Sequence, residues 1–98
     1  MLVCNAGVCV LEDFLEDDTF ENRDLHLDIN VKGAWNVAKA VIPSMKANGG
    51  GAIVVTSSVT GDMVADPGEV AYATSKAALV GFTGFGSFSD LAIWAGWC

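Results

Sequence analysis

A long stretch of helical periodicity between two short apolar runs constrains the fold of this chain more than any other feature. From Thr19 to about Ala47, apolar residues recur at steps of three and four, as on one face of an amphipathic helix. The runs on either side, residues 1–4 and 52–57, are short and rich in aliphatic or β-branched side chains, which is typical of buried strands. The second run has the pattern of a strand covered on both faces. A strand, a helix and a strand in this order form a right-handed βαβ unit with parallel strands. The sequence therefore predicts an α/β fold.

Signals at the ends of these elements agree with this interpretation. Carboxylates favour the positive end of a helix, and Glu16, Asp17 and Asp18 precede the expected start at Thr19. The apolar stripe of this helix consists of Val31, Ala34, Trp35, Ala38, Val41, Ile42 and Met45. Glycines at 49–51 end it, and a Gly-, Asp- and Pro-rich segment at 61–68 predicts a loop before a second helix from about Glu69. Residues 84–98 follow no clean period and remain unassigned.

Polar and small residues follow both predicted strands. Because parallel strands end on the same edge of a sheet, residues 5–7 (Asn-Ala-Gly) and Ser58 are expected to lie near one another there. The second helix carries Tyr72 and Lys76 four residues apart, which places a phenol beside an ammonium on one helix face. A positive charge beside a phenol favours its ionised form, so this pair has the chemistry of a proton-transfer device.

The composition limits the classes of function. With 98 residues, of which 52% are hydrophobic and 17% charged, the chain fits one small ordered domain. A net charge of -7 with only five basic residues argues against a nucleic-acid partner or an anionic membrane surface. Cys4, Cys9 and Cys98 are odd in number and lack metal-ligand spacing, which indicates reduced thiols in the cytoplasm and no metal site. No charge-free apolar run is long enough to span a membrane.

Four motifs, in this order, resemble the short-chain dehydrogenase/reductase family. They are Asn5-Ala-Gly7, Asn30 in Asp-Ile-Asn-Val-Lys-Gly, Ser58 in Thr-Ser-Ser-Val-Thr-Gly, and Tyr72-Ala-Thr-Ser-Lys76. The resemblance spans residues 1–83 and implies the central βαβα portion of a Rossmann-like, doubly wound parallel sheet, with 84–98 as a divergent tail. The chain departs from the family at Cys4, where a second asparagine is common, and it contains no Thr-Gly-x-x-x-Gly-x-Gly turn.

The resemblance implies an NAD- or NADP-dependent oxidoreductase that interconverts a small-molecule carbonyl and an alcohol, without distinguishing the two cofactors. Tyr72 would be the general acid or base, Lys76 would favour its ionised form and bind the nicotinamide ribose, and Ser58 would hold the substrate oxygen. Asn30 would kink the long helix and anchor a water. The adenosine side of the cofactor would be lined by Asn5, Ala6 and Gly7. For a full-length enzyme the resemblance implies a homo-oligomer.

Some residues near these motifs have ordinary explanations. Taken alone, Asn30 could be a polar helix residue and Ser58 a cap at a strand end. His26 is expected on the helix surface because its sequence neighbourhood offers no partner. Two further residues, Thr74 and Ser75, are expected to face solvent or to cap locally, and Trp35 is expected to fill a core or an interface.

Two other hypotheses remain open. The chain could be a truncated, non-catalytic remnant that self-associates or binds an intact homologue through the stripe around Trp35. The segment after Lys76 could associate with membranes because it carries almost no charge, although its glycines and Asp90 count against this. Without a glycine-rich phosphate turn and with few strands, the chain is expected to be marginally stable and to bind dinucleotides weakly.

Overall fold

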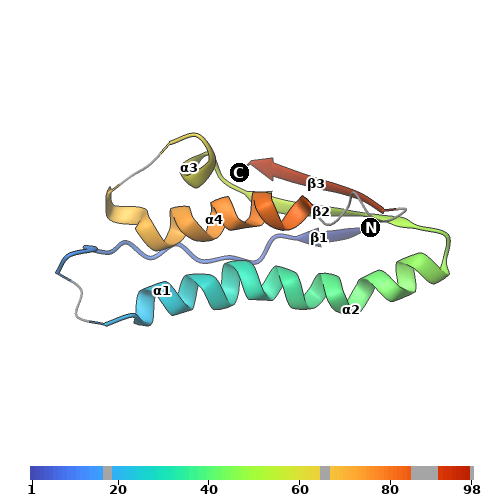
Figure 1. Cartoon of the computed structure of the whole chain (residues 1–98), viewed down its shortest axis with the longest axis horizontal. Coiled ribbons are helices and arrows are strands. Elements are labelled where there is room, and N and C mark those ends of the chain that lie inside the picture. Colours follow the sequence, from blue (N-terminus) through green and yellow to red (C-terminus); the bar gives the residue numbers. More distant parts are fainter. Residues whose placement is uncertain (17–18, 65–66, 85–90, 98) are drawn as a thin grey trace.

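Three parallel strands form one sheet in the computed structural model, which describes residues 1–16, 19–64, 67–84 and 91–97 (Figure 1). In sheet order the strands are β1 (Leu2–Cys4), β2 (Gly51–Ser57) and β3 (Leu91–Trp97). Leu2 pairs with Ile53 in the β1–β2 register, and β3 pairs with β2 from Gly51 to Ser57. The predicted α/β fold with parallel strands is confirmed.

Helices connect the strands. The long helix predicted from the apolar stripe consists of α1 (Glu21–His26), a π-helical segment η1 (Leu27–Lys32) and α2 (Gly33–Ala47). After β2 come the single turn α3 (Val59–Asp62), the 3-10 turn η2 (Pro67–Glu69) and α4 (Val70–Phe82). The first helix begins at Glu21 rather than at Thr19, whose hydroxyl accepts a hydrogen bond from the Glu21 N–H at 3.4 Å. Asp17 and Asp18 lie outside the described residues.

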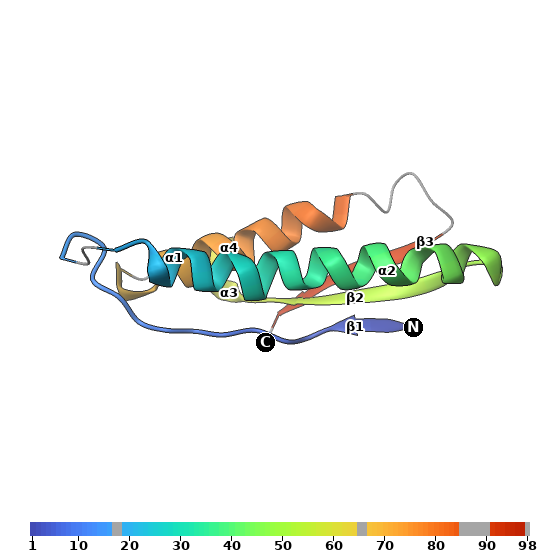
Figure 2. The same cartoon turned by 90° about the horizontal axis from the view of Figure 1, so that it is seen from below.

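Both long helices cover the same face of the sheet, as Figure 2 shows. Right-handed crossovers between strands in the order β1-β2-β3 place successive helices on one side. Ile53 and Val55, which share a face of β2, accordingly pack with both Ala38 of α2 and Leu79 of α4. This arrangement is the partial Rossmann-like α/β fold that the motifs implied.

The strands are less enclosed than the sequence predicted. Along β2, the helix-facing residues Ile53, Val55 and Ser57 are buried. Ala52, Val54 and Thr56 on the other face are only half-buried. On β1, Val3 is 52% exposed. The prediction that residues 52–57 form a strand covered on both faces is therefore wrong, because the described helices pack against one face only.

The core is small and built around the middle of β2. Ala38, Ile53, Val55 and Leu79 are buried, and partly buried apolar side chains surround them: Leu2, Cys4, Ala34, Ile42, Met45 and Phe82. Much of the predicted stripe thus reaches the core. Trp35 does not, since it is 54% exposed and packs on the Phe82 ring with centroids 5.5 Å apart.

Two segments were not foreseen in their final form. The unassigned segment at 84–98 contains β3. This strand pairs in parallel with β2, a partner that its irregular sequence pattern does not indicate. Within the expected loop at 61–68, α3 forms a turn in which Gly61 has φ +101° and lies against the backbone of Ala73 in α4. A side chain at Gly61 would collide with the Ala73 carbonyl, so glycine is required for α3 to approach α4.

Candidate active site

The carboxyl ends of β1 and β2 bring two of the sequence motifs together. The Thr56 hydroxyl at the end of β2 donates a hydrogen bond of 3.0 Å to Oδ1 of Asn5, which directly follows β1. Ser58 is buried, has an extended backbone and caps α3, because its Oγ accepts from the Thr60 N–H at 3.2 Å. The strand-end cap expected for Ser58 is thus present at the sheet edge that the parallel topology predicted.

Lys76 is fixed against β2 at both its backbone and its side chain. The Ser57 hydroxyl donates to the Lys76 carbonyl oxygen at 2.8 Å, and the Lys76 Nζ donates to the Thr56 carbonyl oxygen at 3.0 Å. Only 5% of Lys76 is exposed. Its Nζ lies 5.7 Å from the centroid of the half-buried Tyr72 ring. The i, i+4 spacing therefore does place an immobilised ammonium beside the phenol.

Asn30 joins the loop after β1 to α4. Its Oδ1 accepts from the Val8 N–H at 2.8 Å, while its Nδ2 donates to the Val8 carbonyl at 3.0 Å and to the Ser75 hydroxyl at 2.9 Å. The residue lies in the π-helical segment and is 1% exposed. Its side-chain amide is thus occupied by structural hydrogen bonds.

Gly7 allows these groups to converge. A Cβ at this position would lie 3.1 Å from Oδ1 of Asn30 and 3.4 Å from Nζ of Lys76. Gly7 does not have a positive φ, so its small size rather than its conformational freedom is what the site uses. The absence of a side chain at Gly7 thus lets the backbone of the Asn-Ala-Gly segment approach Asn30 and Lys76 closely.

The N-terminus of α4 receives its cap from a distant part of the chain. The capping position, Glu69, makes no side-chain cap hydrogen bond. Instead, Oε1 of Glu12 accepts from the Ala71 N–H at 2.6 Å, and the Glu12 N–H donates to the Gly68 carbonyl at 3.0 Å. A carboxylate is well suited to the positive end of a helix. Sequence reasoning missed Glu12; the available signal was the absence of a Ser, Thr, Asp or Asn cap directly before α4.

The structure decides two expectations about polar residues. His26 was expected on the surface but is fully buried, and its ring contacts the Tyr72 ring edge-to-face with centroids 6.3 Å apart. Ser75 was expected to face solvent or to cap locally; it is buried, and its hydroxyl makes a local hydrogen bond by donating to the Tyr72 carbonyl at 2.8 Å. The sequence signal was the recurrence of Asn22, His26 and Asn30 every four residues, which forms a polar stripe beside the apolar one. Thr74 is exposed, as expected.

The surroundings of Cys4 and Cys9 raise the pKa of both thiols. Cys9 is exposed and its thiol donates to Oε1 of Glu69 over 3.8 Å. Burial of part of the thiol, followed by the Glu69 charge and its hydrogen bond, raises the pKa of Cys9 above its ordinary value. Burial also raises the pKa of Cys4. Less thiolate is therefore present at neutral pH, in agreement with a site whose chemistry does not use these thiols.

Within the described ranges, no group of three His, Cys, Asp or Glu side chains is placed to hold a metal ion. No helix in the same part of the chain is long and apolar enough to cross a membrane.

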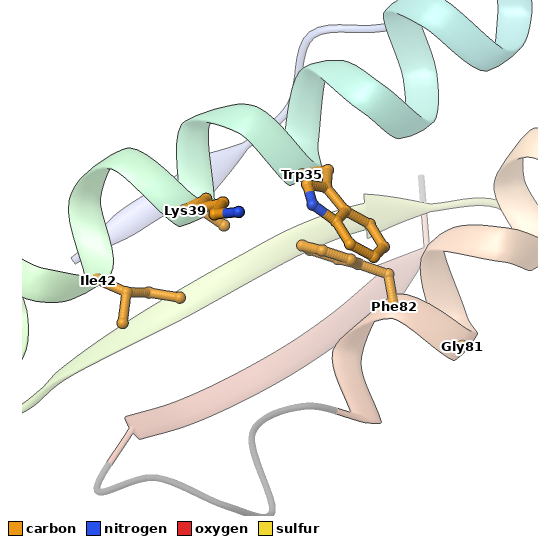
Figure 3. A pocket seen from close by; sticks show the side chains of 6 residues that line it. Trp35, Lys39, Ile42, Gly81 and Phe82 are labelled. Atoms are coloured by element: carbon orange, nitrogen blue, oxygen red, sulfur yellow. The ribbon is translucent and has the colours of Figure 1, made fainter.

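A large apolar hollow lies on the helix layer rather than at the sheet edge. It has a volume of about 450 Å³, and Figure 3 shows the Trp35 and Phe82 rings meeting over it from α2 and α4. Its lining residues are Trp35, Ala38, Lys39, Ile42, Gly81 and Phe82. Since Tyr72 and Ser58 are not among them, this hollow belongs to the helix surface and not to the candidate catalytic groups.

The residues present fit one end of a dinucleotide. The Tyr72 hydroxyl and the Lys76 ammonium have the donor chemistry that a ribose diol accepts. Beside β1, a hollow of about 180 Å³ is lined by Asn5 and Ala6 together with apolar side chains of the long helix. This volume is below the roughly 300 Å³ at which ligand pockets usually begin. The sequence contains no glycine-rich turn that would cradle the pyrophosphate.

Comparisons with known proteins agree with the motifs. Residues 1–87 match the family model of the short chain dehydrogenases. Over 83 residues, the chain is 65% identical to the oxidoreductase UcpA of Salmonella typhimurium and 42% identical to human dehydrogenase/reductase SDR family member 4. Each alignment covers 85% of this chain but only 31% or 30% of the relative, so the chain spans about a third of the length of these curated relatives.

The solved structure of serine dehydrogenase from Escherichia coli superposes with a TM-score of 0.86 over 96% of this chain and 45% of the other chain. At 23% sequence identity, this similarity demonstrates the fold alone. The match to the family model over residues 1–87 shows the family as well as the fold. The chain therefore belongs to the short-chain dehydrogenase/reductase family of oxidoreductases.

Proposed function

We propose that this chain forms the central part of an NAD(P)-dependent oxidoreductase that interconverts a carbonyl and an alcohol, with Tyr72 as the general acid or base. The observation that carries the proposal is the Lys76 ammonium, held on the Thr56 carbonyl at 3.0 Å and lying 5.7 Å from the Tyr72 ring. The ammonium thus lies against the ring whose hydroxyl is proposed to release and regain a proton during the reaction.

Each residue of the catalytic set has a distinct task in this proposal. In reduction, the Tyr72 hydroxyl donates its proton to the carbonyl oxygen; in oxidation, the phenolate accepts the proton of the alcohol. The Ser58 hydroxyl, buried at the end of β2, donates a hydrogen bond to the substrate oxygen as negative charge develops there. Asn30 keeps the loop at residues 5–8 beside Lys76 through its hydrogen bonds to Val8.

NAD or NADP supplies the hydride chemistry when bound. Tyr72 and Lys76 are proposed to hold its ribose and nicotinamide end, and Asn5, Ala6 and Gly7 its adenosine side. The substrate is a small molecule, and the exposed Trp35 ring, which packs on the half-buried Phe82, is compatible with a homo-oligomer of the full-length enzyme. The cytoplasm is the proposed compartment, because Cys4 and Cys9 are free thiols, which a reducing environment maintains.

The alternative of a non-catalytic remnant is not favoured. The relatives named above carry the names of an oxidoreductase and a dehydrogenase/reductase, and none is named as a binding module. A copy of the chain that only associates with itself would need neither the buried ammonium nor the glycine beside it.

The decisive experiment places this chain in a complete protein. Residues 1–83 replace the aligned segment of Salmonella typhimurium UcpA, and consumption of NADH or NADPH is followed with a panel of aldehydes and ketones. We expect the chimera to retain the activity of the parent, and Tyr72→Phe to reduce its kcat/KM by roughly 10²-fold or more, the usual contribution of general acid–base catalysis. An unchanged kcat/KM after Tyr72→Phe, or an inactive folded chimera of an active parent, would refute the proposal.

A further inference from the structure

A ladder of polar side chains on the long helix holds the loop that follows β1. Asn22, His26 and Asn30 stand four residues apart, and together they bind the backbone of Val8 and Val10. Four helical residues advance by about 6 Å and two extended residues by about 6.6 Å, so Asn30 meets Val8 and His26 meets Val10. Asn22 binds the carbonyl oxygen of Val10, the residue that His26 also holds. Side chains of the long helix thereby make hydrogen bonds to the backbone of this loop, as the backbone of a neighbouring strand would do in a sheet.

The central rung, His26, uses both ring nitrogens. The Val10 N–H donates to Nε2 at 3.1 Å, so Nε2 must be unprotonated. The neutral ring then carries its proton on Nδ1, which lies 2.8 Å from the Asn22 carbonyl oxygen and donates to it. With both nitrogens engaged and no exposed surface, this imidazole is placed to orient its neighbours rather than to exchange protons with a substrate.

The same ring contacts the proposed catalytic tyrosine. The planes of the His26 and Tyr72 rings meet at 80° with centroids 6.3 Å apart, which is a favourable edge-to-face geometry. The Lys76 ammonium lies 5.7 Å from the Tyr72 centroid. Tyr72 is only half-buried, so the His26 contact removes rotamers that a half-buried phenol could otherwise adopt.

We propose that His26 is a positioning residue for Tyr72: as a neutral Nδ1–H imidazole fixed by Val10 and Asn22, it holds the phenol ring toward Lys76. This inference rests on the function proposed above, because positioning matters for catalysis only if Tyr72 exchanges the proton. It concerns a residue outside the four motifs and assigns it no contact with substrate or cofactor.

The unmodified 98-residue chain allows a direct test, since it contains one histidine and one tyrosine and their NMR signals need no further assignment. In ¹⁵N-labelled protein we expect a protonated Nδ1 and an unprotonated Nε2 at neutral pH. We also expect nuclear Overhauser effects from the Tyr72 ring to the His26 ring and to the Lys76 side chain. An Nε2–H tautomer, or no cross-peak between the two rings, overturns the proposal without any variant having to fold.

Two variants separate positioning from mere support of the fold. His26→Phe keeps a ring against Tyr72 and should retain the Tyr72–Lys76 cross-peak, whereas His26→Gln keeps polar atoms but loses the ring and should reduce that cross-peak at least twofold. Asn22→Ala is the matched control, because it removes a rung that does not touch Tyr72 and should leave the cross-peak unchanged. Methyl signals of Ile53 and Val55 report whether the core is intact in each variant.

A folded His26→Gln protein with the wild-type cross-peak overturns the proposal, as does loss of the cross-peak in a folded His26→Phe protein. If His26→Gln fails to fold, the His26→Phe variant and the unmodified chain still decide. None of these measurements uses a cofactor or a substrate. Failure of the proposed reaction in the chimera would therefore be distinguishable from failure of this inference.

Discussion

At the scale of single residues, the site depends on glycines that leave room for their neighbours and on hydrogen bonds that immobilise Lys76. Gly7 admits Asn30 and Lys76 because it has no Cβ, and Gly61 admits the backbone of Ala73 for the same reason. Lys76 is one residue with two anchors on β2, at its carbonyl and at its ammonium. Packing space and hydrogen-bond partners, rather than residue type alone, thus determine where the groups of the proposed site lie.

The Cys9 thiol provides a pH-dependent test of this environment. Burial and then the negative charge of Glu69 raise the pKa of Cys9, while Lys76 acts in the opposite direction. Glu69→Gln removes that negative charge, so we predict a lower thiol pKa, more thiolate at a given pH and a severalfold faster reaction with iodoacetamide near pH 8.

The reaction rate would be measured against pH in a Cys4→Ser, Cys98→Ser background, in which Cys9 is the remaining thiol. Glu16→Gln, a change of an exposed acid outside this hydrogen bond, serves as the control and should leave the profile in place. A Glu69→Gln profile that coincides with the parent would show that the Glu69 contact does not act on the thiol.

At the scale of elements, remote side chains determine where helices begin and what they carry. The loop before α1 contributes Glu12 to the start of α4, and the π-helical segment presents Asn30 to the loop after β1. Glu12 and Asn30, which lie between β1 and α2 in the sequence, therefore help to position α4, the helix that bears the proposed catalytic tyrosine. This coupling explains why the site needs both helices on one face of the sheet.

We predict that Glu12→Ala destabilises the protein by about 0.5–2 kcal/mol, the usual cost of losing a helix cap. Because the lost partner is the Ala71 N–H, hydrogen exchange should accelerate first at that amide in the first turn of α4. Urea unfolding monitored by tryptophan fluorescence measures the stability, with Glu16→Ala as a control for removal of an exposed acid. Equal effects of the two substitutions would contradict a capping role.

At the scale of the whole molecule, the chain presents a partial Rossmann-like α/β fold. Its three strands have helices on one face among the described residues, and its core is confined to a few side chains around Ile53 and Val55. The sheet edge carries the proposed catalytic groups, but the sequence contains no glycine-rich turn for a pyrophosphate. In the proposed function, catalytic geometry and cofactor affinity would thus depend on separate parts of the sequence.

This separation predicts weak binding of NADH and NADPH by the 98-residue chain. Loss of two hydrogen bonds to a charged group, at about 1.5 kcal/mol each, corresponds to an affinity roughly 100-fold lower than that of a complete relative. Quenching of tryptophan fluorescence on titration with either cofactor would be compared between the chain and full-length UcpA. Binding by the chain as tight as by UcpA would show that a glycine-rich turn is not needed for this affinity.

The sequence by itself determined the local elements and the order of the site motifs. The long helix, β2 and α4 were predictable because their periodicity and their glycine boundaries lie within a few residues of each element. The meeting of Asn5 with the end of β2 followed from the rule that parallel strands end on one edge of the sheet. For these features, neighbours in the sequence carry nearly all the information.

Only the tertiary structure decided the burial of His26 and Ser75, the capping of α4 by Glu12, the exposure of Trp35 and the pairing of β3 with β2. The hydrogen bond from Glu12 to Ala71 spans 59 positions of the sequence, and that from Asn30 to Ser75 spans 45. Pairings at such separations depend on how the helices pack on the sheet, because burial makes an unpaired polar group costly and so selects partners that local patterns cannot reveal.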